Sequence, residues 1–179
     1  INSIEELAQI KHHKLKEQLE KFGPQHGDIS KQIILQSQSK IRNKAIKLNS
    51  ETTLNNLKQA KGLYIYDIES DPDVKHDFLH GFIRLPKNIK NEISLEKTKY
   101  SPLLNLEQNS ESFLWKRINK KLSLNKDYPI IHYGETEPIA LIKLASRQGA
   151  NPHEIEALKK RFIDIHLLLK KCWCLPVRN

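Results

Sequence analysis

The sequence is poor in cysteine, has no long apolar run and contains no methionine among its 179 residues. Its two cysteines, Cys172 and Cys174, are too few and too close to form a disulfide framework or a four-ligand zinc site. We expect free, partly buried thiols in a reducing compartment. No stretch approaches the ~20 apolar residues that a membrane span needs, and the first residues, "INSIEELAQIKHH", do not have the pattern of a signal peptide. These absences predict a cytoplasmic protein with no membrane partner. The missing initiator methionine suggests a fragment of a longer chain.

Basic residues outnumber acidic residues in the sequence. Lysine and arginine number 30 against 21 acidic residues, a formal net charge of +9. This surplus predicts attraction to polyanions, of which nucleic acid is the commonest, although many basic proteins are basic for solubility alone. The hydrophobic fraction of 38% is enough for one core and excludes two large ones.

Residues 1–60 have the pattern of an N-terminal helical arm and linker. A helix is predicted over 3–23, with Ser3 as N-cap, Glu6 completing a capping box and Gly23-Pro24 as the stop. A second helix is predicted over 28–48, followed by a polar linker over 49–62. Lysines and arginines within 11–61 are candidates for a positive rim, although a lysine-rich helix face is usually only solvated.

Residues 61–179 alternate between strand and helix patterns. Strands are predicted over 63–69 and 76–86, joined by a tight turn, with a short third strand between 87 and 109. A helix from Ser110, a buried strand over 128–134, a helix over 137–149 and one or two further helices after 151 follow. This order predicts an α/β domain with a mixed sheet flanked by helices.

Acidic residues crowd the end of the first strand, in "YDIESDPD". Asp67 and Glu69 are two residues apart on a strand, so both side chains point to one face. Such a pair could share Mg²⁺ or Mn²⁺, as a two-metal phosphodiesterase requires. Alternatively, Asp67 caps the strand end and Glu69 is solvated. Asp71 and Asp73 are better explained as turn formers around Pro72.

A second polar stretch, "HYGETE", follows the strand over 128–134. Glu137 opens a helix, where the dipole favours a carboxylate, and it could reach the metal pair if the two strands are neighbours. His132 could position a phosphate or the attacking water, or it could be a buried histidine bonded to backbone. Tyr133 could stack on a nucleobase or fill the core.

These motifs resemble the ribonuclease H-like domain of the predicted RecB-family nucleases, within the DEDD (DnaQ-like) 3′–5′ exonuclease superfamily. The resemblance rests on "LYIYDIESDPD", "HDFLHGFIRLP", "PIIHYGETEPIALIKLA" and "FIDIHLLLKKCWCLPVRN", in that order. It implies a ribonuclease H-like nuclease domain over 61–179 that is truncated at its C-terminus, since a later motif supplies the family's fourth carboxylate. Ser70 stands where the family has glycine, and Thr136 replaces its aromatic residue.

The resemblance implies a divalent-metal-dependent nuclease of the 3′–5′ exonuclease type, connected with DNA repair. Asp67, Glu69 and Glu137 would be the metal ligands for Mg²⁺ or Mn²⁺ in a two-metal site, with His132 among the catalytic residues. Asp164 would support the ligands or serve the structure, and Tyr133 would contact nucleic acid. The expected partners are nucleic acid, DNA rather than RNA, and flanking domains of the same polypeptide.

Two alternatives come from other functional classes. With three of four carboxylates present, the chain could be a catalytically incomplete nucleic-acid-binding or scaffold domain of the same fold. It could also be a protein-interaction domain whose N-terminal helices bind a partner. Nucleic-acid binding that weakens with salt would favour the first of these over the second.

Overall fold

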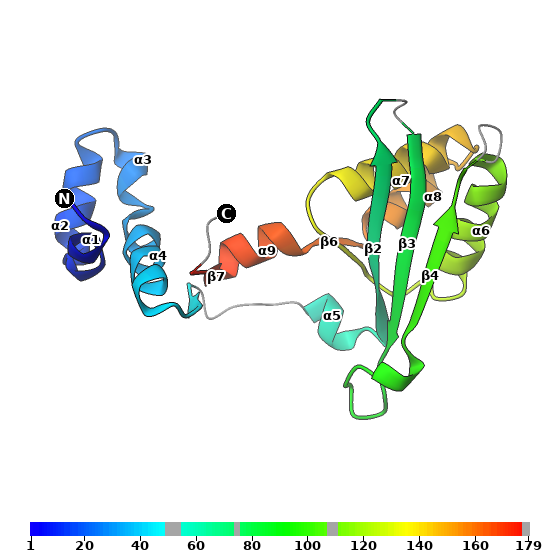
Figure 1. Ribbon diagram of the computed structural model, residues 1–179, viewed down its shortest axis with the longest axis horizontal. Helices are drawn as coiled ribbons and strands as arrows, with labels where there is room; N and C mark the ends of the chain where they lie inside the picture. The colour runs from blue at the N-terminus through cyan, green and yellow to red at the C-terminus, as the bar shows by residue number, and fades with distance from the viewer. Residues whose placement is uncertain (49–54, 74–75, 107–110, 177–179) are drawn as a thin grey trace. The chain divides into compact units, whose positions relative to one another are not determined.

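The chain is described by a computed structural model that covers residues 1–48, 55–73, 76–106 and 111–176. It divides into two compact units (Figure 1). Unit 1 combines residues 1–53 with 167–179, and unit 2 is the continuous stretch 54–166. The sequence pattern instead divides the chain between residues 60 and 61 and keeps the C-terminal segment with the sheet.

Unit 1 is mainly helical. Its elements are α1 (Ile4–Gln9), α2 (His12–Glu20), α3 (Pro24–Gly27), α4 (Ser30–Arg42), β1 (Ile46–Lys47), β7 (Trp173–Cys174) and most of α9 (Ile165–Cys172). Ser3 caps α1, because its side chain accepts a hydrogen bond from the Glu6 amide. The single helix expected over 3–23 is wrong, since extended backbone at Ile10 and Lys11 separates α1 from α2.

A short strand pair explains why the C-terminal segment belongs to unit 1. β1 and β7 are antiparallel, with Ile46 opposite Cys174, and the Ser39 hydroxyl donates to the Cys174 carbonyl at 2.8 Å. The helix expected over 28–48 therefore ends early, at the left-handed Asn43. Both cysteines are free and buried, as expected, and burial raises the pKa of the Cys174 thiol.

Unit 2 contains a five-stranded mixed sheet. Its elements are α5 (Asn55–Gln59), β2 (Gly62–Asp71), β3 (His76–Pro86), the 3-10 helix η1 (Leu95–Lys97), β4 (Lys99–Leu104), α6 (Glu111–Ser123), β5 (Ile130–His132), α7 (Thr136–Arg147), α8 (Pro152–Lys159) and β6 (Phe162–Asp164). The strand order is β4-β3-β2-β5-β6. β3 is antiparallel to both β2 and β4, whereas β2, β5 and β6 run parallel.

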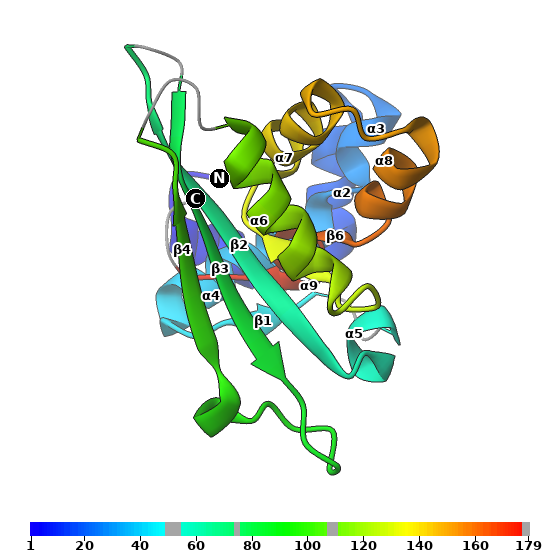
Figure 2. The same ribbon diagram turned by 90° about the vertical axis from the view of Figure 1, so that its right-hand side faces the viewer.

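The core of unit 2 lies between the sheet and the helices α6, α7 and α8, which share one side of the sheet (Figure 2). Tyr64, Tyr66 and Phe82 supply the largest buried side chains from the strands. Leu114 and Ile118 of α6 pack against them together with Leu141, Leu144 and Leu158 of α7 and α8. The helices thus bury one face of β2, and the alternating residues of that strand face the other way.

The fold class predicted from the sequence is confirmed: unit 2 is α/β, with a mixed sheet flanked by helices. The hairpin and the short third strand are also as expected, although Ser110 and residues 49–54 of the expected linker lie outside the described ranges. The strand β6 was missed, because "FID" lies inside a run with helical periodicity. Across the described ranges, no helix combines the length and apolar character needed to cross a bilayer.

Candidate functional site

The strands β2, β5 and β6 are parallel, so their carboxyl ends lie at one edge of the sheet. The predicted site residues lie within the last part of these strands or directly after them. The pairing of Ile65 with Ile131 confirms that the strand before His132 lies beside the first strand. Asp67 and Glu69 are both exposed and alternate with the buried Tyr66. The two carboxylates therefore share the face of β2 that α6, α7 and α8 leave open.

The turn after β2 accounts for the remaining acidic residues. The Asp73 amide donates to Asp71 Oδ1 at 2.9 Å, which fits the turn-forming role expected for this pair. A bulge between Glu69 and Ser70 shifts the pairing, and the Ser70 hydroxyl donates to Asp77 Oδ1 at 2.6 Å. The bulge separates the candidate pair from the hairpin tip.

Glu137 lies in the first turn of α7, and its side chain is 92% buried, with 8% of its surface exposed. Its Oε2 atom has no hydrogen-bond partner among the described residues. Burial, and then the carboxylates of Asp77, Glu137 and Asp67, raise the pKa of the Tyr66 phenol above its ordinary value. The carboxylates of Asp67 on β2 and Glu137 on α7 thus act electrostatically on the same phenol.

His132 and Asp164 make mainly structural contacts. His132 is buried and donates from Nδ1 to the Gly134 carbonyl at 2.6 Å, the backbone-bonded arrangement that was one of its two expected roles. Asp164, the last residue of β6, accepts hydrogen bonds at Oδ1 from the amides of Gly134 at 3.3 Å and His166 at 2.8 Å. The carboxylate connects the turn that follows β5 with the first turn of α9.

Tyr133 is exposed over 62% of its surface, so it does not fill the core. Its ring lies 4.8 Å from the ring of His166, centroid to centroid, with 31° between the planes. The sequence analysis did not identify His166. No motif there marks it, because its contact with Tyr133 depends on the pairing of β5 with the unexpected strand β6.

The donor set at this edge fits a hard divalent cation in its chemistry. Carboxylate oxygens, the ligands that such cations prefer, are offered by Asp67, Glu69 and Glu137. The Oε2 atom of Glu137 is buried, and no hydrogen bond from the described residues compensates for its loss of contact with water. In the described ranges, however, no three His, Cys, Asp or Glu side chains are grouped closely enough to hold a metal ion. The three candidate ligands expected from the sequence therefore do not form a closed metal-binding group in the described ranges.

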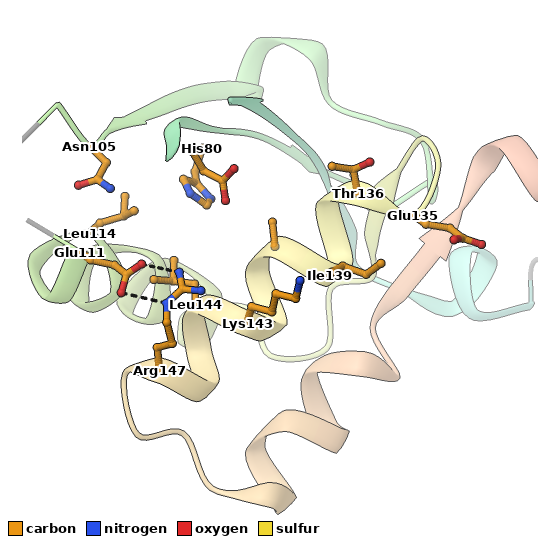
Figure 3. A pocket seen from close by; sticks show the side chains of 12 residues that line it. His80, Asn105, Glu111, Leu114, Glu135, Thr136, Ile139, Lys143, Leu144 and Arg147 are labelled. Carbon is orange, nitrogen blue, oxygen red and sulfur yellow. Dashed lines mark hydrogen bonds and ion pairs between the residues drawn. The ribbon is translucent and has the colours of Figure 1, made fainter. Parts of the chain in front are cut away.

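A pocket of about 540 Å³ opens between β3, α6 and α7 (Figure 3). His80 and Asn105 contribute buried polar groups, and Leu114 and Leu144 contribute apolar ones. Glu111 and Arg147, which also line the pocket, form an ion pair. His80 is hydrogen-bonded through Nδ1 to the Tyr66 phenol at 2.8 Å. His80 was not identified from the sequence. It lies two residues before Phe82 on β3, so it shares the face of that strand with an apolar residue, and this spacing could have indicated a buried histidine.

No family model matches the chain, and neither a curated protein nor a solved structure matches it. The sequence motifs and the geometry of unit 2 are therefore the basis on which a function can be proposed.

Proposed function

We propose that unit 2 is the ribonuclease H-like domain of a divalent-metal-dependent nuclease, of the 3′–5′ exonuclease type, which hydrolyses nucleic-acid phosphodiester bonds. The mixed sheet flanked by helices is the architecture that the resemblance implies. The observation that carries the proposal is Glu137, whose carboxylate is buried in the first turn of α7 with one oxygen unpartnered among the described residues. Buried polar atoms without a partner are few in native proteins, and a catalytic role or a bound ion is among the reasons for which one is kept.

The roles of the residues follow from their positions. Asp67 and Glu69 present carboxylates from the exposed face of β2 and would hold Mg²⁺ or Mn²⁺. Glu137, in the first turn of α7, is the third ligand that the resemblance implies. A bound cation of this kind supplies an activated water and charge stabilisation for phosphodiester hydrolysis. His132 fixes the turn at Gly134 that leads from β5 into α7, and it thereby helps to position Glu137.

Calorimetric titration of the chain with Mn²⁺ tests the proposal. We expect saturable binding that is lost in Asp67→Ala and in Glu137→Gln, because each variant removes a carboxylate ligand. Glu135→Gln is the matched control, since Glu135 is exposed two residues before Glu137.

Absence of Mn²⁺ binding to the wild-type chain, or binding that Glu137→Gln leaves intact, would contradict this proposal. A second candidate function would then be favoured: a nucleic-acid-binding or scaffold domain of the same fold. The lack of a closed three-ligand group in the described ranges supports that candidate, because binding alone requires no preformed metal site.

A further inference from the structure

A second pocket of unit 2, of about 570 Å³, lies between α6, the turn after α7 and α8. None of the candidate metal ligands lines it, so it is separate from the site described above. Its volume is within the ~300–1,000 Å³ that small-molecule pockets have. Its apolar wall consists of Trp115, Leu122, Ala145 and Leu158.

Small residues keep this pocket open. Gly149, Ala150 and Ala157 line it, and no described atom beyond the adjoining residues lies within 4 Å of the position that a Cβ would take at Gly149. Gly149 has φ of +84°, a left-handed conformation that glycine adopts without strain. Trp115 packs against the core of unit 2 but is only partly buried, so a flat ring has room to lie against its indole.

The charged side chains around the pocket favour an anion. Lys126, His153 and Arg161 line it, against a single acidic residue, Glu154. The Glu154 carboxylate is already engaged, because its Oε2 accepts a hydrogen bond from the Asn151 amide in the capping box of α8. Among the residues that the structure describes, no carboxylate forms an ion pair with Lys126 or His153.

Arg161 also has hydrogen-bond donors to spare. A guanidinium has five N–H groups. Arg161 donates three of them, from Nε, Nη1 and Nη2, to backbone carbonyls, so one N–H on each terminal nitrogen has no partner in the described ranges. Two such N–H groups can bind two oxygens of one phosphate or carboxylate.

We propose that this pocket binds a small ligand that has a flat ring system and one anionic group, a phosphate or a carboxylate. The ring would lie against Trp115, and Arg161 and Lys126 would bind the anionic group. A nucleoside monophosphate and an aromatic carboxylate both have this chemistry. The inference does not rest on the proposed function, because the pocket contains none of the candidate metal ligands.

Tryptophan fluorescence tests the pocket, because the sequence has only two tryptophans, Trp115 and Trp173. Trp173 lies on β7 of unit 1, so the signal of Trp173→Phe comes from Trp115 alone. We expect a saturable change in this signal with adenosine 5′-monophosphate, with benzoate or with both, in EDTA at fixed ionic strength. A response to the nucleotide alone identifies a phosphate ligand, and a response to benzoate alone identifies a carboxylate ligand.

The neutral counterparts of these probes, adenosine and benzyl alcohol, should bind at least tenfold more weakly, because they lack the anionic group. Inorganic phosphate should also bind at least tenfold more weakly than a ligand that carries the ring as well. These comparisons separate recognition of the whole ligand from binding of an apolar ring or an anion by itself.

Two substitutions in the Trp173→Phe background place the binding in this pocket. Ala157→Leu puts a larger side chain into the space and should weaken binding at least tenfold. Lys126→Gln should weaken it about threefold, because it removes one exposed contact between opposite charges. Lys120→Gln is the matched control, since Lys120 is exposed on α6 but does not line the pocket.

The proposal is overturned if neither anionic probe gives a saturable change, or if the neutral counterparts or inorganic phosphate bind as tightly. It is also overturned if Ala157→Leu leaves the affinity intact, or if Lys120→Gln and Lys126→Gln have equal effects. Thermal unfolding shows whether a loss in Ala157→Leu reflects misfolding, and Lys126→Gln then decides the question. Because EDTA removes divalent metal, this result is independent of the Mn²⁺ titration.

Discussion

Tyr66 is the side chain through which the core of unit 2 and the candidate site influence each other. Its ring stacks on Phe82 at 4.6 Å, and its hydroxyl is hydrogen-bonded to the buried His80. Burial and three neighbouring carboxylates raise the pKa of the phenol, so the folded protein keeps the phenol protonated at a pH where the unfolded chain would ionise it. The stability of unit 2 should therefore fall in alkaline solution.

Replacement of Tyr66 by phenylalanine tests this linkage. At pH 8 the wild type should be more stable than Tyr66→Phe by about 1 kcal/mol, because the variant lacks the hydrogen bond to His80. Between pH 8 and pH 10.5 this difference should shrink by about 0.8 kcal/mol, because the unfolded wild type gains stability by releasing a proton that the folded state retains. Urea denaturation at the two pH values gives the numbers.

Tyr100→Phe removes an exposed phenol instead of a buried one and should keep the wild-type dependence on pH. A gap between wild type and Tyr66→Phe that stays constant or widens up to pH 10.5 would show that the phenol is not linked to stability in this way.

Among the secondary-structure elements, those specified by local patterns were predicted and those specified by tertiary contacts were not. The alternation in "LYIYDIE" is sufficient for β2, and the apolar spacing of Leu114, Ile118 and Leu122 is sufficient for α6. β6 has three residues and is a strand because it pairs with β5. Likewise, β1 and β7 have two residues each and are strands only because they pair with each other, although they are far apart in the sequence.

The candidate site shows the same division. The common face of Asp67 and Glu69 on β2 and the place of Glu137 in the first turn of α7 were predicted from spacing, because a strand and a helix start each fix where a side chain points. Spacing did not predict the burial of Glu137 or the contact between Tyr133 and His166. The first depends on how α7 packs on the sheet, and the second depends on the pairing of β6 with β5. Sequence spacing carries no information on which of two expected roles a side chain such as His132 adopts.

Arg161 joins three structural elements in unit 2. Its guanidinium donates to the backbone carbonyls of Leu122, Asn125 and Tyr128, at the end of α6 and in the segment that leads into β5. Burial lowers the pKa of this guanidinium, yet no carboxylate is recorded among its hydrogen-bond partners in the described chain. Its contribution to the fold is therefore made through backbone carbonyls rather than through an ion pair.

Arg161→Lys should lower the free energy of unfolding by about 2–3 kcal/mol, because an ammonium group cannot reach three carbonyls arranged for a guanidinium. Guanidinium chloride denaturation measures the loss. Lys160→Ala, at the exposed neighbouring position, should change stability by less than about 0.5 kcal/mol. Equal effects of the two substitutions would mean that the three hydrogen bonds contribute little.

For the whole molecule, the net charge is unevenly distributed. Residues 1–53 and 167–179 carry 12 basic and 6 acidic side chains, whereas residues 54–166 carry 18 and 15. Unit 1 thus has a net charge of +6 and unit 2 of +3, although unit 1 is the smaller of the two. If a nucleic-acid backbone is bound, most of the non-specific attraction should come from unit 1.

The triple substitution Lys14→Gln, Lys21→Gln and Lys31→Gln tests this division, with Lys116→Gln, Lys120→Gln and Lys126→Gln as a control of equal charge. All six lysines are exposed. The first set should reduce the slope of log affinity for oligothymidylate against log salt concentration by about 2, if each lysine neutralises a phosphate. The control set should change the slope by less than about 1. The reverse order would place the backbone contact on unit 2.

The alternation along β2 has a consequence for folding fidelity. If β2 slipped by one residue against β3, Tyr64 and Tyr66 would turn to the open face and Asp67 and Glu69 would enter the core. Two unpaired carboxylates in that position would cost more free energy than unit 2 can supply. A one-residue slip of β2 is thus strongly disfavoured, so the same alternation that builds the core also keeps this acidic pair in solvent.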